Sequence, residues 1–173
     1  YKVADAFDDG ASFAIAQGLR GNIKGYEAAQ EQISKAIGLA KVTSSALTKI
    51  SDSLSDLEGL LVRLADDSLS ADEREQYSAD YTAITADLDA YVTNANFKGT
   101  NIIDGANPID VVTDIAGGTS ELTGSDQSGL QAALETGHAD TADIQSGEAV
   151  TLIGGALATA KTSIGNALND LAS

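Results

Sequence analysis

A stretch of about 56 residues, from Ala11 to Asp66, contains no proline and repeats its apolar residues at helical spacing. Steps of four and three residues alternate along its first half, and after a change of phase near Ser44 they resume along its second half. Spacing that averages 3.5 residues keeps one stripe of a helix facing a partner helix. The stretch therefore predicts a single helix of roughly 80 Å, packed against long partners in a rod. The stripe comprises Leu19, Ile23, Tyr26, Gln30, Ile33, Ile37 and Ala40, then Leu47, Ile50, Leu54, Leu57, Leu61 and Leu64.

Glycines interrupt the first half of this stretch. Gly18, Gly21 and Gly25 are three and four residues apart, so they share one helix face. A glycine inside a helix costs about 1 kcal/mol relative to alanine, but its missing side chain lets another backbone come close. We interpret this face, with its neighbouring cations, as a subunit-packing surface made of Gly18, Arg20, Gly21, Lys24 and Gly25. The alternative is a break near Gly21 to Gly25 that gives two shorter helices.

Two more long helices are predicted downstream. Ser70 and Glu73 have the spacing of a capping box, which starts a second helix. Its apolar positions again alternate steps of four and three, so we expect it to lie antiparallel on the last half of the first helix after a tight turn. The helical period returns from about Asp140 to Ser173, where a third helix closes the bundle.

The period changes between the second and third helices. Segments rich in Ile and Val, Thr100–Asp104 and Ile109–Ile115, flank Gly105–Pro108 and predict a β-hairpin, with a possible third strand at Thr119–Leu122. A short helix is expected within residues 128–136. The predicted fold is mainly α, an elongated antiparallel bundle of long helices with a small β-hairpin region. Residues 1–99 and 138–173 would form a helical core rod, and residues 100–137 the hairpin and a short variable region.

Composition excludes several classes of function. The net charge of −16 makes binding to nucleic acid or to an anionic membrane unfavourable. The chain has no cysteine, and no run approaches the roughly 20 apolar residues of a membrane span. Its single histidine, His138, lies in a stretch typical of a surface loop, and pairs of acids are expected by chance among 26 carboxylates. We therefore expect no catalytic, cofactor or metal site, and no enzyme.

Several motifs resemble bacterial flagellin. Residues 4–25, which include Phe13-Ala-Ile-Ala, Leu19-Arg20 and Ile23-Lys-Gly25, are similar to an acidic segment of that family that leads into its first long helix. Leu47-Thr-Lys-Ile50 resembles the family's Leu-Asn-Glu-Ile repeat. Asn96-Phe-Lys-Gly99, followed by two isoleucines, resembles its Phe-Asn-Gly segment. Residues 156–162 resemble, more weakly, the start of its carboxy-terminal core helix.

The resemblance implies a structural subunit that polymerises with other copies into the filament used for motility. It further implies export through the growing flagellum to the cell exterior, an export chaperone and a filament cap as partners, and no membrane insertion. The sequence would be an inner core fragment without the terminal polymerisation segments. A hook-filament junction protein and a flagellin-like surface protein that binds polysaccharide remain alternatives.

One segment departs from the family pattern. Innate immune receptors recognise a Gln-Arg-x-Arg-Glu-Leu-Ala-Val segment in many flagellins, and the matching residues here run from Ser55 to Val62. Asp56 and Glu58 replace the two arginines, and Gly59 replaces the glutamate. A receptor patch that pairs with arginines would therefore meet like charge. The altered segment comprises Asp56, Leu57, Glu58, Gly59, Leu60 and Val62.

Overall fold

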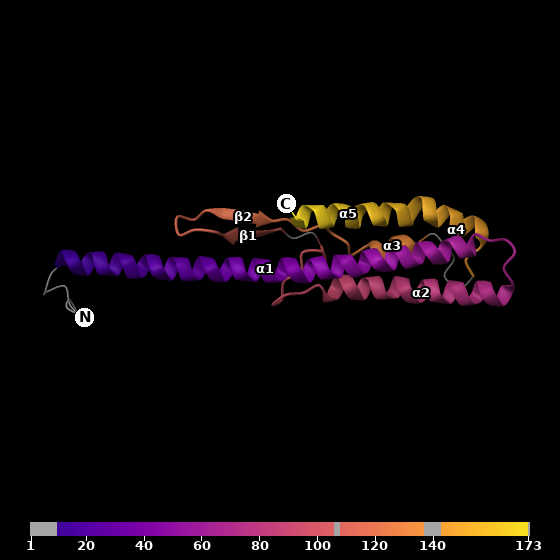
Figure 1. The fold of residues 1–173 in the computed structure, drawn as a ribbon, viewed down its shortest axis with the longest axis horizontal. Coiled ribbons are helices and arrows are strands. Elements are labelled where there is room, and N and C mark those ends of the chain that lie inside the picture. Colours follow the sequence, from indigo (N-terminus) through magenta and orange to yellow (C-terminus); the bar gives the residue numbers. More distant parts are fainter. Residues whose placement is uncertain (1–9, 106–107, 137–142, 173) are drawn as a thin grey trace. The chain divides into compact units, whose positions relative to one another are not determined.

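The computed structural model describes residues 10–105, 108–136 and 143–172. Within these ranges the chain is mostly helical, with long helices and one small two-stranded antiparallel sheet, as predicted (Figure 1). Helix α1 runs unbroken over Gly10–Leu64, so the predicted single helix is confirmed and a break near Gly21 to Gly25 is not found. Two compact units divide the chain: unit 1 holds residues 1–38 and 110–122, and unit 2 holds 39–109 and 123–173. These boundaries differ from the division at residues 99 and 138, which remains a prediction.

The second half of the predicted apolar stripe forms the core of unit 2. Each of its six residues, from Leu47 to Leu64, is at most 1% exposed. Burial of a whole leucine or isoleucine side chain stabilises a fold by about 1.5–3 kcal/mol. This stripe is therefore the main apolar surface by which the second half of α1 packs into unit 2.

Helix α2 (Ala71–Asn94) begins at the predicted capping box. The Ser70 hydroxyl accepts from the Glu73 amide, and the Glu73 carboxylate accepts from the Ser70 amide. The helix runs antiparallel to the second half of α1: the Lys49 ammonium lies 5.9 Å from the centre of the Tyr91 ring, and the Arg63 guanidinium 5.6 Å from that of Tyr77. In both pairs the residue numbers have the same sum, as an antiparallel register requires.

Arg74 fixes the turn that joins α1 to α2. Its guanidinium donates to the carbonyl oxygens of Leu64 and Asp66, at 2.9 and 2.8 Å, and also to that of Ile144 at 2.9 Å. Carbonyls at the end of a helix have no partner within the helix. One side chain thus satisfies carbonyls at the end of α1 and ties this end to the segment that leads into helix α4 (Ser146–Leu152).

The predicted hairpin is wrong in its pairing. Strand β1 (Ile109–Val112) pairs with β2 (Thr119–Leu122), whereas residues 100–104 form no strand. The Asn101 side chain accepts from the Ile103 and Asp104 amides and donates to the Val92 carbonyl, so this segment bonds locally instead of in a sheet. Its isoleucines are nevertheless buried in unit 2.

The segment after β2 closes over the buried isoleucines. The Gln127 amide donates to the Ile103 carbonyl at 2.8 Å. A Cβ added to Gly124 would lie 2.0 Å from the Ile102 carbonyl oxygen, so this close approach of two backbones requires glycine. Helix α3 (Leu130–Glu135) follows and packs against α2, where the buried Tyr81 hydroxyl donates to the Leu134 carbonyl at 3.1 Å.

The last predicted helix is interrupted. Its described part consists of α4 (Ser146–Leu152), a π-helical segment η1 (Ile153–Leu157) and α5 (Ala158–Ala172), with the predicted start near Asp140 outside the described residues. Lys161 on α5 pairs with Glu58 on α1 at 2.5 Å. The C-terminal helices therefore cover another side of the same stretch of α1 within unit 2 (Figure 1).

Unit 1 departs most from the prediction. The first half of the apolar stripe was expected to face a partner helix, yet Leu19, Ile23 and Tyr26 are 57–60% exposed. The only other described element of this unit is the β1–β2 hairpin, which is too short to cover a long helix face. The apolar spacing is therefore present, but the described chain does not bury it.

Candidate functional site

The predicted subunit-packing surface lies on the part of α1 that belongs to unit 1. Gly18, Arg20, Gly21 and Lys24 are exposed there. A Cβ added at Gly18 or Gly21 would meet no atom within 4 Å, so these glycines leave open space beside the helix. The packing of another subunit against this surface remains a prediction.

Gly25 differs from the other two glycines. A Cβ at this position would lie 2.7 Å from Cγ2 of Ile115, in the turn between β1 and β2. The hairpin of the same unit therefore occupies the space that this glycine leaves. Sequence spacing placed all three glycines on one helix face. It could not show that Ile115 of the same chain already fills the space beside Gly25.

The predicted receptor-equivalent segment lies in unit 2 and divides among several surfaces. Leu57 is fully buried in the core and is not available to a partner. Glu58 faces α5, where it pairs with Lys161. Val62 is 59% exposed. Asp56, Gly59 and Leu60 line a surface groove.

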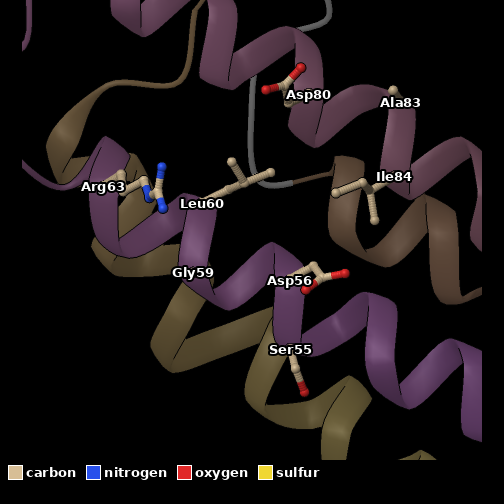
Figure 2. A pocket seen from close by; sticks show the side chains of 8 residues that line it. All are labelled: Ser55, Asp56, Gly59, Leu60, Arg63, Asp80, Ala83 and Ile84. Atoms are coloured by element: carbon tan, nitrogen blue, oxygen red, sulfur yellow. The ribbon is translucent and has the colours of Figure 1, made fainter.

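This groove lies between α1 and α2 and has a volume of about 470 Å³ (Figure 2). The Leu60 side chain points from α1 into the space between the helices, and Ile84 lies on the α2 side. The missing side chain of Gly59 widens the space between Asp56 and Arg63. The groove thus has an apolar floor with charged groups at its edges, as protein-contact sites do.

Sequence reasoning missed the α2 side of the groove. Asp80, Ile84 and Arg63 line the groove but were not predicted as site residues. The antiparallel register could have found them, because Leu60 stands opposite Asp80, and Asp56 opposite Ile84, when the same residue-number sum is applied that relates Arg63 to Tyr77.

The described residues contain neither a metal-binding cluster nor a membrane-spanning helix. In these ranges no group of three or more His, Cys, Asp or Glu side chains is arranged to hold a metal ion. Of the helices described, none combines the length and hydropathy needed to cross a membrane. His138, expected in a surface loop, lies outside the described residues.

Over the described residues, the fold is that of a mainly helical protein of long helices with one small two-stranded sheet. The family model described as "Bacterial flagellin N-terminal helical region" matches residues 1–108, which is more than half of the chain. The chain therefore belongs to the bacterial flagellin family.

Individual relatives agree with the family match. Flagellin FlaB1 of Treponema pallidum is 26% identical over 105 residues, which are 61% of this chain and 37% of that protein. Flagellin of Bacillus subtilis is 26% identical over 114 residues, which are 65% of this chain and 38% of that protein. The matched region therefore spans a little over a third of each relative.

The fold also resembles a solved structure. A crystal structure of Bacillus cereus flagellin matches with a TM-score of 0.66 at 22% identity, over 80% of this chain and 79% of that chain. The arrangement of long helices with one small sheet is therefore a flagellin fold.

Proposed function

We propose that this protein is a structural subunit of the bacterial flagellar filament and polymerises with other copies into the helical propeller used for motility. The family match over residues 1–108 carries this proposal. The open helix surface around Gly18 and Gly21 supports it, because a polymer needs exposed faces on which copies can pack.

The names of the relatives favour a filament subunit over the alternatives. These relatives are called flagellin or, in Treponema species, flagellar filament core protein. None of these names is that of a hook-filament junction protein or of a polysaccharide-binding surface protein. The proposal includes an extracellular location in the filament, and an export chaperone and a filament cap as partners.

The test uses the full-length protein and its source bacterium. Deletion of the gene should remove the filaments seen by electron microscopy and abolish swimming, and purified full-length protein should polymerise into helical filaments. An antibody against unit 2 should label filaments along their whole length. Labelling confined to the base of the filament would indicate a junction protein instead, and labelling of the surface of filament-free cells would indicate the polysaccharide-binding class.

A further inference from the structure

Asp104 and Gly105 stand at the end of the segment that carries the buried isoleucines, and both residues are exposed. The Asp104 carboxylate makes no hydrogen bond or ion pair with the residues that the structure describes. In an Asp-Gly sequence no Cβ shields the glycine nitrogen from the side-chain carboxyl carbon of the aspartate. An electrophilic carbon and a nitrogen that can attack it are therefore neighbours at a position that solvent reaches.

The chemistry open to this pair is isomerisation of the aspartate. The Gly105 nitrogen forms a bond to Cγ of the protonated Asp104 side chain, while the carboxyl hydroxyl and the amide proton leave together as water. Water then adds to the main-chain carbonyl carbon of the cyclic imide and breaks its bond to the Gly105 nitrogen. The main chain now passes through the former side-chain carbonyl and is one methylene longer. The product is isoaspartate of unchanged mass, and no reagent other than water takes part.

Asp126 holds the nitrogen that would attack. Its Oδ1 accepts from the Gly105 amide at 3.2 Å, and from the Ser128 amide and hydroxyl at 2.9 and 2.7 Å. The Ser128 hydroxyl, the Ser128 amide and then the Gly105 amide keep the pKa of Asp126 below its usual range. Asp126 is therefore an ionised acceptor and a weak base at neutral pH, so it holds the Gly105 N–H group without removing its proton.

The surrounding fold fixes both sides of this contact. The residue after Asp126, Gln127, donates from its backbone amide to the Ile103 carbonyl at 2.8 Å. Asn101 Oδ1 accepts from the amide of Asp104 itself at 3.2 Å. The peptide groups before and after Asp104 are thus both hydrogen-bonded, whereas ring closure requires the second one to turn the face of its plane towards Cγ of Asp104.

We propose that Asp104–Gly105 is a modification site at which the folded chain slowly converts aspartate to isoaspartate, and that Asp126 is a positioning residue that restrains this reaction through the Gly105 amide. Isomerisation lengthens the chain between the hydrogen bond at Asn101 and the one at Asp126, so the two cannot both keep their present geometry. The restraint is therefore lost once the bond has isomerised.

The test follows isoaspartate at residue 104 in the full-length protein. Wild type, Asp126→Ala and Asp126→Asn are kept at neutral pH and digested, and fragmentation by electron transfer in a mass spectrometer distinguishes the two isomers of the peptide that contains residue 104. Isoaspartate should form at least about tenfold faster in Asp126→Ala, since a hydrogen bond to a charged acceptor is lost. Asp126→Asn keeps an acceptor oxygen and should stay closer to wild type.

Asp114→Ala is the matched control. Asp114 Oδ1 also accepts from two backbone amides, those of Ala116 and Gly118 at 2.7 and 2.9 Å, so this variant removes an equivalent set of hydrogen bonds from another turn. It should leave the rate at residue 104 unchanged. The other Asp-Gly pair of the sequence, Asp9-Gly10, is an internal reference in the same digests, and its rate should be equal in all variants.

Two further measurements separate restraint from loss of the fold. In concentrated urea, wild type and Asp126→Ala should isomerise equally fast, because the contact with Gly105 exists only in the folded chain. Protection of the Gln127 amide from hydrogen exchange shows that the segment stays closed in the folded variant. Ser128→Ala removes only one of the hydrogen bonds that anchor Asp126, should give an intermediate rate, and decides the matter if Asp126→Ala does not fold.

The outcomes bear separately on the site and on its restraint. Isoaspartate at residue 104 that forms faster in Asp126→Ala, and not in Asp114→Ala, supports both. Equal rates in folded wild type, Asp126→Ala and Ser128→Ala, or an Asp126→Asn variant as fast as Asp126→Ala, would overturn the restraining role of Oδ1. No isoaspartate at residue 104 in any folded variant, over a time in which the chain in urea converts, would overturn the site itself.

Discussion

At the scale of single residues, the turn after α2 shows how one side chain can be poorly matched to its backbone. Phe97 and Thr100 exchange two backbone hydrogen bonds, of 2.8 and 3.1 Å, across a two-residue turn. Its central residues, Lys98 and Gly99, have φ of 52° and 87°. Two positive φ values define a type I′ turn, in which Asn-Gly is the preferred pair. Lysine pays a steric penalty there that asparagine largely avoids.

Lys98→Asn should therefore stabilise the protein by about 0.5–1 kcal/mol. The Lys98 ammonium lies 5.8 Å from the centre of the Phe97 ring, and this contact is lost in Lys98→Asn and in the control alike. Urea unfolding followed by circular dichroism measures the difference. Lys98→Ala is the control, since it removes the same charge without favouring positive φ; if it stabilised the protein equally, charge and not backbone conformation would be the cause.

Tyr81 makes the free energy of unfolding depend on pH. Burial raises the pKa of its hydroxyl to about 12, with the nearby carboxylates of Glu135 and Glu148 adding to the shift. An unfolded tyrosine titrates near pH 10. Between about pH 10 and 12 the unfolded chain therefore loses a proton that the folded chain keeps, and the free energy of unfolding falls as pH rises.

Tyr81→Phe should lose this alkaline dependence. At neutral pH the same variant should be less stable by about 1 kcal/mol, because the Leu134 carbonyl loses its donor. Unfolding curves at pH 7, 10 and 11 measure both effects. Tyr26→Phe is the control, since Tyr26 is 60% exposed. A wild-type protein equally stable at pH 10 and pH 11 would contradict this role of Tyr81.

At the scale of elements, the sequence predicted those parts whose burial follows a regular period. Leu54 and its neighbours at steps of three and four lie in the core, and Ser70 begins α2. The hairpin was mispaired because Ile102 and Ile103 are buried without a partner strand: the Ile103 carbonyl accepts from the Gln127 backbone amide, and the Asn101 side chain donates to the Val92 carbonyl of α2. Apolar β-branched residues indicate burial, but they do not say which backbone partner satisfies their amides.

The candidate surfaces were predictable only in part, for a related reason. The sequence located Gly21 and Asp56 but not what lies beside them, because neighbours such as Asp80 come from distant parts of the chain. A helical period places a residue on one face of its own helix. The partner across that face is set by the loops that decide how helices pair.

The open space beside Gly21 on α1 bears on filament assembly. Gly21→Leu in the full-length protein should block filament assembly and leave the helicity of the monomer nearly unchanged, since space beside Gly21 is open in the single chain. Gly25→Leu is the contrasting variant: its side chain would collide with Ile115 and should disturb the hairpin even in the monomer. Electron microscopy and circular dichroism measure the two effects. Loss of helicity in Gly21→Leu would show that this glycine serves the monomer's own fold.

At the scale of the whole molecule, the distribution of charge bears on immune recognition. The resemblance to flagellin implies that receptor contacts would be made by arginines where this chain has Asp56 and Glu58. Removing one member of a buried charged pair costs about 2–5 kcal/mol, and even the lower value weakens binding more than tenfold. We therefore expect little or no receptor activation by this protein, measured in reporter cells beside a flagellin that keeps the arginines.

The double variant Asp56→Arg, Glu58→Arg should recover part of the activation. Recovery should be limited by Gly59, where the family has glutamate, and by Lys161, which now pairs with Glu58 and would repel an arginine there. Adding Lys161→Glu restores an attractive pair across the two helices and should raise the response further. Equal potency of the two wild-type proteins would refute the charge argument.

The π-helical segment η1 changes the spacing of buried residues in the last part of the chain. Ala149 and Leu152 are buried before it, and Leu157 and Ala160 after it, so the step across η1 is five residues where a regular helix has three or four. Removing one residue there leaves steps of three and four throughout. Deletion of Gly154 should therefore keep the fold and change stability by no more than about 1 kcal/mol.

Deletion of Gly165 is the matched comparison, since it lies in regular helix α5 between the buried residues Ile164 and Ala167. It would rotate everything beyond it by about 100° and should destabilise the protein, as thermal unfolding of the two variants would show. Within residues 153–157 the chain can therefore lose one residue while the flanking helices α4 and α5 keep their packing. Variation in length among related chains should collect there, while the flanking helices keep their length and vary by substitution alone.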